Sequence, residues 1–415
     1  MEVFDLSDKT ERVILVGVQE NDGDDTEESL QELAELAKTA GAEVVGTVIQ
    51  KRERIHPGTY VRKGKIDEIR TLLNALDATG IICDDELSPV QMNHLQQELE
   101  SKIMDRTLLI LDIFASRAVT KEGKIQVELA QLRYRAVRLV GLGSSLSRLG
   151  GGIGTRGPGE KKLEMDRRLI KERISQLKKE LEHVKKHREL LREGRKKDRV
   201  MTAAIVGYTN AGKSTLLNTL TDAGVLSEDK LFATLDPTTR LLELDGGQRI
   251  YLTDTVGFIR KLPHHLIEAF KSTLEEAKYA DVILHVVDAS NPQVEEQMFI
   301  VYETLRELGV KDKTIVTLFN KQDRLAGNEI LRDFKADYVL KISARTGLGL
   351  DELKNTLEKI LIGNQIYIER VLDYKDAGML QLVRKYSQLI EEKYTENGIE
   401  IKARVPKDIY GRLGE

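Results

Sequence analysis

Apolar positions in the first hundred residues alternate between short β-branched runs and stretches with helical spacing. Residues 12–18 (RVILVGV) predict a strand, and residues 26–40 predict a helix because apolar side chains recur there every three or four positions. Gly41 ends that helix, and residues 43–49 predict a second strand. The same reasoning predicts helices over residues 65–76 and 89–99 and strands over residues 80–83 and 107–111. This alternation is typical of a mostly parallel sheet covered by helices on both faces.

The next block is helical throughout. Residues 123–139 and 160–195 both have helical periodicity, and the second stretch carries apolar side chains every seven residues, interrupted by Arg188. The repeating positions are Ile170, Leu177, Val184 and Leu191, with Ile174 and Leu181 interleaved. Residues 141–159 are rich in glycine and contain no acidic residue. Two helices joined in this way predict an antiparallel hairpin with a glycine-rich loop at its tip.

Strands and helices alternate again from residue 200 to about residue 362. The remaining residues carry two strand-like runs, 365–372 and 398–405, and a helix near residues 378–386, which predicts a small α+β domain.

Composition narrows the classes of protein that fit. With 40% hydrophobic and 32% charged residues, the 415-residue chain is expected to be globular and soluble. No apolar run approaches the roughly 20 residues of a membrane span, and the first residues lack the pattern of a signal peptide, so we expect a cytoplasmic protein. Cys83 is the only cysteine, which excludes an intrachain disulfide and a cysteine-based metal cage.

The net charge of -4 hides a basic segment. Residues 160–199 hold 16 lysines and arginines against 9 acidic residues. Such a run is either a solvated helix face or a surface that contacts RNA.

The first chemical motif is a phosphate-binding loop. Residues 207–214 (GYTNAGKS) match G-x-x-x-x-G-K-[ST], and they follow the apolar residues 201–206 and open a helix. Backbone N–H groups of such a loop surround an anion at a helix N-terminus. We expect Lys213 to neutralise the β- and γ-phosphates and the Ser214 hydroxyl to ligate Mg²⁺.

A second motif identifies the base. A predicted strand ends in residues 320–323 (NKQD), where the Asp323 carboxylate can accept two hydrogen bonds from guanine N1–H and N2–H₂. Adenine offers neither donor on that edge, so the nucleotide is expected to be GTP. Asn320 is expected to support the loop, Lys321 to lie over the base, and residues 343–345 (SAR) to give a backbone N–H to guanine O6.

Two switch segments are expected between these motifs. Residues 254–257 (DTVG) follow a strand, so that Asp254 would hold Mg²⁺ and the Gly257 N–H would contact the γ-phosphate. Residues 232–236 (FATLD) are the expected first switch, in which Thr234 closes on Mg²⁺ only when the γ-phosphate is present.

Three further residues affect the expected mechanism. Thr238 and Thr239 are alternatives to Thr234 as the switch ligand. Phe258 follows Gly257 where many GTPases have a water-orienting glutamine, so we expect slow intrinsic hydrolysis that a partner accelerates; the alternative is a side chain that only packs under the switch. Asn210 suggests a K⁺ ion beside the phosphates.

The chain resembles the HflX family of translation-factor-related GTPases. The resemblance rests on stretches that run from the first domain through the nucleotide-binding domain: DDELSP (84–89), residues 105–131, GGIGTRGPGE (151–160), GYTNAGKS, FATLDPTTR (232–240) and DTVGF. It selects Thr234 as the Mg²⁺-binding threonine. It also implies a protein that binds the large ribosomal subunit and splits stalled or idle ribosomes, with Arg148 and Arg156 of the glycine-rich loop reaching towards the peptidyl-transferase region.

Two alternatives to ribosome splitting remain. One is a GTPase that assembles large-subunit precursors, and the other is an ATP-dependent remodeller of ribosomal RNA that uses the first domain. Family members are reported to hydrolyse ATP, which would make ATPase activity secondary here. A basic glycine-containing turn of the first domain, residues 60–65 (YVRKGK), precedes a helix and suits anions. It is either a contact for a phosphate of ribosomal RNA or a solvated turn, or else a second nucleotide site.

We therefore expect an α/β protein with a helical hairpin. Its domains are an N-terminal parallel α/β domain (1–112), the hairpin (113–198), a P-loop G domain (199–365) and a small α+β domain (366–415). The expected cofactor is Mg²⁺, with GTP and GDP as substrate and product, and the free protein is expected to be a monomer.

The expected site residues fall into three groups. The catalytic residues are Lys213, Thr234 and Gly257. The metal ligands are Ser214, Thr234 and Asp254. The nucleotide-binding residues are Gly207, Tyr208, Thr209, Asn210, Ala211, Gly212, Lys213, Ser214, Phe232, Ala233, Thr234, Leu235, Asp236, Asp254, Thr255, Val256, Gly257, Asn320, Lys321, Gln322, Asp323, Ser343, Ala344 and Arg345.

Overall fold

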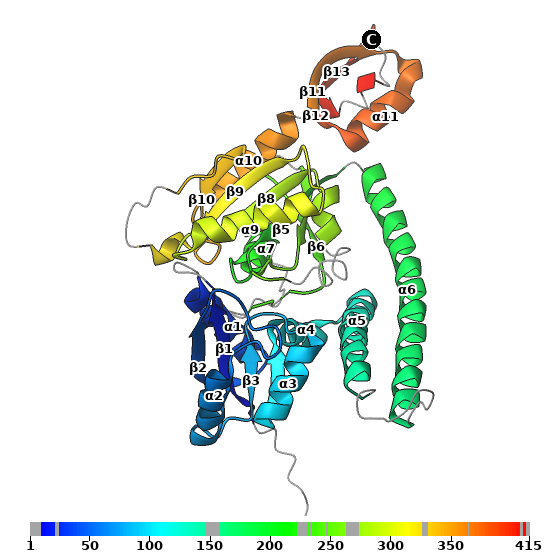
Figure 1. Ribbon diagram of the computed structural model, residues 1–415. Coiled ribbons are helices and arrows are strands. Elements are labelled where there is room, and N and C mark those ends of the chain that lie inside the picture. Colours follow the sequence, from blue (N-terminus) through cyan, green and yellow to red (C-terminus); the bar gives the residue numbers. More distant parts are fainter. Residues whose placement is uncertain are drawn as a thin grey trace, which may run out of the picture. The chain divides into compact units, whose positions relative to one another are not determined.

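The protein folds into two compact units, seen in the computed structural model (Figure 1). The first unit comprises Met1–Lys185, Glu228–Asp236 and Val256–Leu274, and the second comprises Lys186–Ser227, Pro237–Thr255 and Glu275–Glu415. The structure describes residues 10–20, 25–146, 158–198, 200–221, 231–232, 234–245, 248–262, 274–325, 331–363, 365–406 and 410–411. Among their helices, none combines the length and the apolar character that a bilayer crossing requires.

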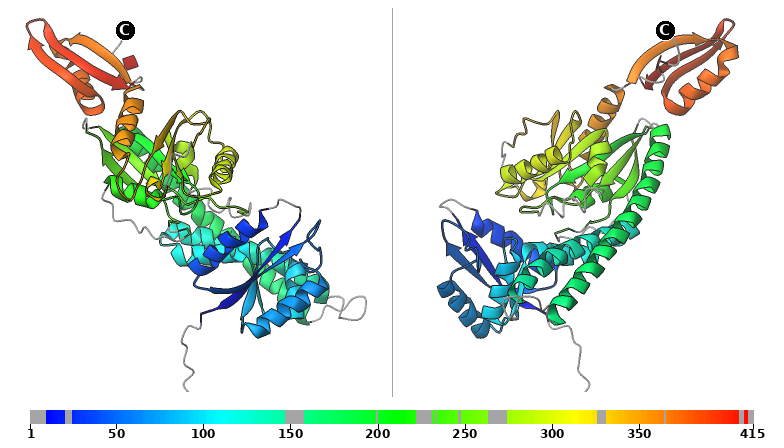
Figure 2. Two further views of the ribbon diagram at one scale, coloured as in Figure 1. Left: turned by 90° about the vertical axis from the view of Figure 1, so that its left-hand side faces the viewer. Right: turned by 45° about the vertical axis from the view of Figure 1, so that its right-hand side comes forward.

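Four parallel strands form the sheet of the first unit, in the order β2-β1-β3-β4. Helix α1 covers one face of this sheet, and α2 and α3 cover the other (Figures 1 and 2). The parallel sheet covered on both faces is therefore confirmed. The bounds are β1 Arg12–Gln19, α1 Thr26–Thr39, β2 Glu43–Lys51, α2 Lys63–Ala75, β3 Gly80–Cys83, α3 Pro89–Leu99 and β4 Lys102–Asp105.

The prediction of a strand over residues 107–111 is wrong. These residues lie in α4 (Arg106–Arg117), and the fourth strand is the preceding β4. Asp105 ends that strand and caps the helix, because its carboxylate accepts a hydrogen bond from the Leu108 N–H at 2.8 Å. Helix α4 is buried on most of its sides, so its apolar run has no visible period and resembles a buried strand.

Helices α5 (Lys121–Leu146) and α6 (Pro158–Asp198) form the predicted antiparallel pair. Glu128 pairs with Arg173 at 2.7 Å, whereas the Leu139 carbonyl accepts from Arg167, so position numbers fall along α6 as they rise along α5. Apolar side chains of both helices pack between them; these are Ile125, Leu129, Leu132, Ile174, Leu177, Leu181 and Val184.

The predicted tip loop is shorter than expected, because α5 continues to Leu146 and α6 begins at Pro158. The expectations for Arg148 and Arg156 lie outside the described residues. Residue 112, an expected domain boundary, falls within α4, and the division into four domains stays a prediction.

A six-stranded sheet forms the centre of the second unit, in the order β10-β9-β8-β5-β7-β6. Its strands are parallel except β6, which is antiparallel to β7. Helices α7 and α10 pack against one face and α9 against the other (Figure 2). The bounds are β5 Met201–Gly207, α7 Lys213–Thr221, β6 Thr238–Glu243, β7 Arg249–Asp254, β8 Val282–Asp288, α9 Val294–Glu307, β9 Thr314–Asn320, β10 Tyr338–Lys341 and α10 Leu350–Gly363.

The last residues form the predicted α+β element with one strand more than expected. Strands β11 (Gln365–Leu372) and β13 (Gly398–Pro406) and helix α11 (Ala377–Tyr386) match the prediction. The strand that we missed is β12 (Gln388–Thr395), which pairs with β13. A bulge between Leu389 and Glu391 breaks its alternation, so the sequence QLIEEKYT shows no clear period of two.

Candidate nucleotide-binding site

The phosphate-binding loop joins β5 to α7, as the motif predicts. A Cβ atom on Gly207 would lie 2.2 Å from the Val286 carbonyl oxygen of the neighbouring strand. Gly212 has a φ of +97°, and a Cβ atom there would lie 2.3 Å from Asn320 Nδ2. Both positions therefore require glycine, the first because of a close backbone approach and the second also because of its left-handed conformation.

Lys213 is a buried lysine at the first turn of α7. Its side chain is 6% exposed, and its Nζ donates a hydrogen bond to the Tyr208 carbonyl at 2.7 Å. Burial lowers the pKa of Lys213 to about 8, with a further lowering by Lys321 and an opposing effect of Asp254. A bound anion would relieve this penalty, because it would supply the negative charge that the site lacks.

Ser214 and Asp254 lie together at the same edge of the sheet. The Ser214 hydroxyl donates to Asp254 Oδ2 at 2.7 Å, and the Asp254 side chain is fully buried at the end of β7. A hydroxyl and a carboxylate next to a phosphate-binding loop are oxygen donors of the kind that Mg²⁺ prefers. The residues present therefore fit a magnesium ion.

Asn320 connects three parts of the site. Its Nδ2 donates to the Ala211 carbonyl of the phosphate-binding loop, and its Oδ1 accepts from the Ala344 N–H, both at 2.8 Å. The side chain is 2% exposed. Asn320 thus links the phosphate-binding loop to the segment that contains Ala344. The Ala344 N–H, which belongs to the segment expected to contact guanine O6, donates to Asn320.

Asp323 is exposed, and Ser343 holds its carboxylate. The Ser343 hydroxyl donates to Asp323 Oδ1 at 2.7 Å, and this hydrogen bond lowers the pKa of Asp323. The carboxylate is therefore ionised near neutral pH and fixed as an acceptor.

Lys321 has a partner that the sequence analysis missed. Its backbone is left-handed (φ +63°), and its Nζ donates to Asp288 Oδ2 at 2.7 Å. Asp288 ends β8, beside the strand that ends at Asn320. The available signal was its place at the end of a parallel strand, where site residues of such sheets gather.

The other predicted residues of the second unit are distributed around this site. Thr209 and Thr255 are buried, and the Thr255 hydroxyl donates to the Ile205 carbonyl at 2.8 Å. Asn210 is exposed and left-handed (φ +59°). Gln322 donates through Nε2 to the Phe319 carbonyl at 3.1 Å. Tyr208 and Ala211 are buried, and Arg345 is exposed.

The expected first switch belongs to the first unit, where it packs on helices α4 and α5. The Phe232 ring meets the Phe114 ring edge-on at 4.7 Å between centroids. The Asp236 carboxylate accepts hydrogen bonds from the N–H groups of Val119 (3.0 Å) and Thr120 (2.9 Å), just before α5. A Cβ atom on Gly123 would lie 2.4 Å from Asp236 Oδ1. The residues around Thr120 therefore contact the expected first switch, a role that we did not predict.

The structure places the other switch residues as follows. Thr234 and Leu235 lie between Phe232 and Asp236, and Leu235 is buried. Ala233 lies outside the described residues. Thr238 and Thr239 belong to strand β6, where the Thr239 hydroxyl lies 2.9 Å from that of Thr253. The Thr239 hydroxyl is therefore hydrogen-bonded to a residue of the neighbouring strand β7.

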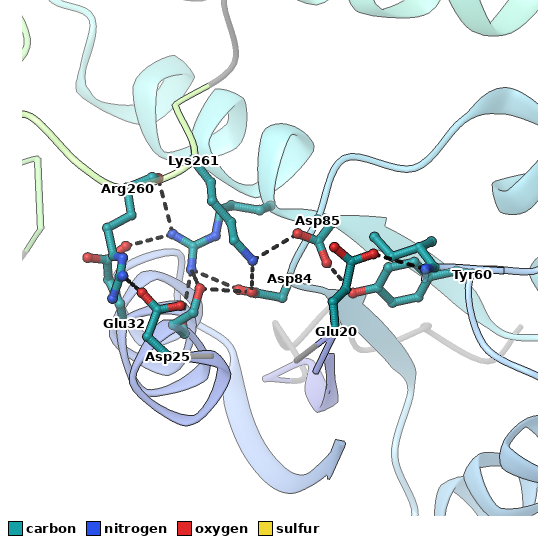
Figure 3. A network of polar contacts seen from close by, with 11 residues as sticks. Glu20, Asp25, Glu32, Tyr60, Asp84, Asp85, Arg260 and Lys261 are labelled. Carbon is teal, nitrogen blue, oxygen red and sulfur yellow. Dashed lines mark hydrogen bonds and ion pairs between the residues drawn. The ribbon is translucent and has the colours of Figure 1, made fainter. Parts of the chain in front are cut away.

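The expected second switch begins at Asp254 in the second unit, and its continuation from Val256 onward belongs to the first unit. Val256, Gly257 and Phe258 are buried, and Phe258 is 1% exposed. Arg260 and Lys261 form ion pairs with acidic residues of the α/β domain, drawn in Figure 3. The packed Phe258 side chain fits the alternative that this residue fills space under the switch.

Residues 60–65, the basic turn of the first domain, bond to neighbouring residues of the first unit. Tyr60 is 1% exposed, and its hydroxyl donates to Asp85 at 2.7 Å. The Arg62 N–H donates to Gln50, and Lys65 pairs with Glu68 at 2.8 Å. The turn therefore supports the α/β domain and the residues that contact the second switch.

Known proteins match this chain over its length, and three family profiles match successive parts of it. Family profiles described as "GTP-binding GTPase N-terminal", "GTP-binding GTPase Middle Region" and "50S ribosome-binding GTPase" match residues 27–115, 117–195 and 202–321. A "GTPase HflX" of Lacrimispora saccharolytica is 67% identical over 414 residues, which cover 100% of this chain and 98% of that protein. A "GTPase HflX" of Caldanaerobacter subterraneus subsp. tengcongensis is 49% identical over 413 residues, covering 99% and 94%.

Among solved structures, a GTP-binding protein from Sulfolobus solfataricus in complex with GDP is similar to this chain. It is 26% identical, with a TM-score of 0.45, and the alignment covers 84% of this chain and 98% of that one.

Proposed function

Because the chain belongs to the HflX family of GTPases, we propose that its GTP-bound form binds the large ribosomal subunit and separates the subunits of stalled or idle ribosomes. The chain is a GTP hydrolase with a P-loop domain, and the profile that matches this domain is described as a ribosome-binding GTPase. The observation that carries the proposal is a relative matching the complete chain, so that the hairpin and the GTPase domain are matched together.

The proposed nucleotide site uses the residues that the sequence motifs single out. Lys213 faces the β- and γ-phosphates, and the backbone of residues 207–212 surrounds them. Ser214 and Asp254, which are hydrogen-bonded to each other, would hold Mg²⁺, and Thr234 would be a further ligand in the GTP state. Bound at these residues, Mg²⁺ would neutralise negative charge on the phosphate oxygens. Asp323 accepts from the guanine N1–H and N2–H₂ groups.

Hydrolysis by the free protein is slow, because the residue after Gly257 is the buried Phe258. This side chain cannot orient a water molecule, so the ribosome must order the switches or supply polar groups. The Gly257 N–H would donate a hydrogen bond to the γ-phosphate. The conformation of the residues that follow would then depend on whether the γ-phosphate is bound. A K⁺ ion beside Asn210 would add charge to the same region, and equal turnover in potassium and sodium buffers would remove that idea.

The hairpin is the part that reaches into the ribosome. The 41 residues of α6 span about 60 Å at ~1.5 Å per residue. Its arms are fixed to each other by the apolar seam and by the pair of Arg173 with Glu128. Arg148 and Arg156, which lie outside the described residues, would contact phosphates of ribosomal RNA.

Nucleotide affinity is expected to fall above pH 8. Lys213 has a pKa of about 8 in the nucleotide-free protein, and a bound phosphate raises that pKa, so binding takes up a proton above pH 8. Affinity for GDP should therefore be constant near pH 7 and be lower by about tenfold at pH 9. Titration calorimetry in buffers of different ionisation enthalpy measures both the affinity and the proton uptake.

The matched variant for this prediction is Lys213→Arg, whose guanidinium stays charged across the range. Its residual GDP binding should show no proton uptake. Proton uptake of equal size in this variant would assign the titration to another group.

Stimulated turnover tests the proposed function. GTP turnover in potassium buffer should rise by about two orders of magnitude or more with purified large subunits, by the action of a GTPase partner on the switches. Unchanged turnover would leave a GTPase whose activator is a different molecule. Preferential stimulation by immature subunits would favour the assembly factor, and ATP turnover that survives Lys213→Ala would favour the RNA remodeller.

A further inference from the structure

Lys261 connects the second switch segment to the N-terminal α/β domain. It lies four residues after Gly257 in the sequence, and both residues belong to the first compact unit. Its backbone is left-handed (φ +50°), a conformation that lysine adopts rarely. The surroundings must therefore favour this placement of the side chain.

The Lys261 ammonium group forms ion pairs with two aspartates (Figure 3). Its Nζ lies 2.5 Å from Asp84 Oδ2 and 2.8 Å from Asp85 Oδ1. Both aspartates follow strand β3, in the motif DDELSP, and Asp84 is 1% exposed. We call Asp84 and Asp85 the acidic pair.

The acidic pair is held in place by residues of its own domain. Asp84 Oδ1 accepts from Arg106 Nη2, and Asp84 Oδ2 accepts from the Ser29 hydroxyl, both at 2.8 Å. Asp85 accepts from the Tyr60 hydroxyl at 2.7 Å. These bonds do not involve Lys261, so the carboxylates keep their positions when the lysine leaves.

The charge balance of this region depends on the switch. Arg106 is buried and pairs with Asp84 and with Glu32 at 2.6 Å, so the carboxylates of Asp84, Asp85 and Glu32 outnumber its single guanidinium. Arg260 adds a second contact, since it pairs with Asp25 and its carbonyl accepts from Arg106. The switch therefore supplies the cations that this part of the domain lacks.

We propose that the acidic pair is a receptor for Lys261 that stabilises one conformation of the second switch and so sets the relative affinity of the protein for GTP and GDP. The proposal rests on the proposed function only in treating residues from 254 onward as a nucleotide switch. A contact that favours one switch conformation shifts affinity towards the nucleotide that selects this conformation. By linkage, the bound nucleotide then determines how firmly the α/β domain holds the switch.

The test compares nucleotide preference in full-length variants. Dissociation constants for GDP and for a non-hydrolysable GTP analogue are measured with Mg²⁺ by fluorescence. Lys261→Met keeps the length of the side chain and removes its charge, and it should change the ratio of the two constants by about fivefold or more. Asp85→Asn should change the ratio in the same direction, and the double variant no more than Lys261→Met alone.

Two controls separate the contact from general effects on folding. Lys261→Arg keeps the charge and should leave the ratio within about twofold of the wild-type value. Lys38→Met removes an exposed lysine from α1 of the same unit and should leave it unchanged. Asp84 is left intact, because its loss would remove one of the two carboxylates that pair with the buried Arg106.

An unchanged ratio in Lys261→Met would overturn the proposal, even where thermal stability falls, because the contact would then only support the fold. Additive effects in the double variant would overturn it too. The measurement needs no ribosomes, so a changed ratio in a protein that ribosomes do not stimulate would reject the proposed function alone.

Discussion

Asp323→Asn is expected to invert the base preference of the protein. The carboxylate that accepts from guanine N1–H and N2–H₂ becomes an amide, whose NH₂ group faces the guanine NH₂ group. Affinity for GTP should fall by about a thousandfold or more, since an unpaired polar group is left in the site. Xanthosine triphosphate carries an oxygen in place of that NH₂ group, so its affinity should rise. Competition binding with the two nucleotides measures the change.

The structure supports a clean comparison for this variant. Ser343 holds Asp323 Oδ1 through a hydrogen bond that an asparagine oxygen also accepts, so the loop should keep its conformation. Asp351→Asn, at an exposed position of α10, is the matched control. Equal losses of affinity for both nucleotides would show that Asp323 shapes the loop without contacting the base.

Lys213→Ala is expected to abolish most GTP hydrolysis. The side chain is the buried cation of the phosphate-binding loop, and its removal withdraws charge stabilisation from the γ-phosphate in the transition state. We expect kcat/KM to fall by roughly 10²- to 10³-fold. Steady-state phosphate release measures this value, with Lys359→Ala on the exposed face of α10 as the control.

A smaller defect would contradict the role of Lys213. Its Nζ donates to the Tyr208 carbonyl in the nucleotide-free loop, so the variant also loses an internal contact. Thermal unfolding without nucleotide separates the two effects. A variant that unfolds at the wild-type temperature and hydrolyses GTP within about tenfold of the wild-type rate would place the phosphate contact elsewhere.

Local patterns predicted most of the elements around the candidate site. The glycines of residues 207–214 fix the turn between β5 and α7, and the alternation of strands and helices orders the sheet. Asn320 follows from the same logic, because the ends of parallel strands meet at one edge. The prediction of a strand where α4 lies was wrong, because this helix is buried on most of its sides and its sequence has no helical period. Strand β12 was missed, because a bulge interrupts its alternation.

Contacts between distant segments could not be predicted from the sequence. The motif DDELSP was recognised only as a family resemblance, because nothing in its spacing shows that Asp84 and Asp85 meet a lysine that lies 177 positions from Asp84. The hydrogen bond from the Thr120 N–H to Asp236 likewise joins segments that are far apart in the sequence. Such pairs depend on tertiary packing, and one sequence contains no signal for them.

The central claim is that the GTP-bound protein separates ribosomal subunits. The most direct measurement follows light scattering of purified, intact ribosomes after the protein is added with GTP, a non-hydrolysable GTP analogue or GDP. The account predicts a fall in scattering with GTP and with the analogue, little change with GDP, and none with Lys213→Ala. Ribosomes that stay intact in the GTP state, while GTP turnover proceeds, would contradict it.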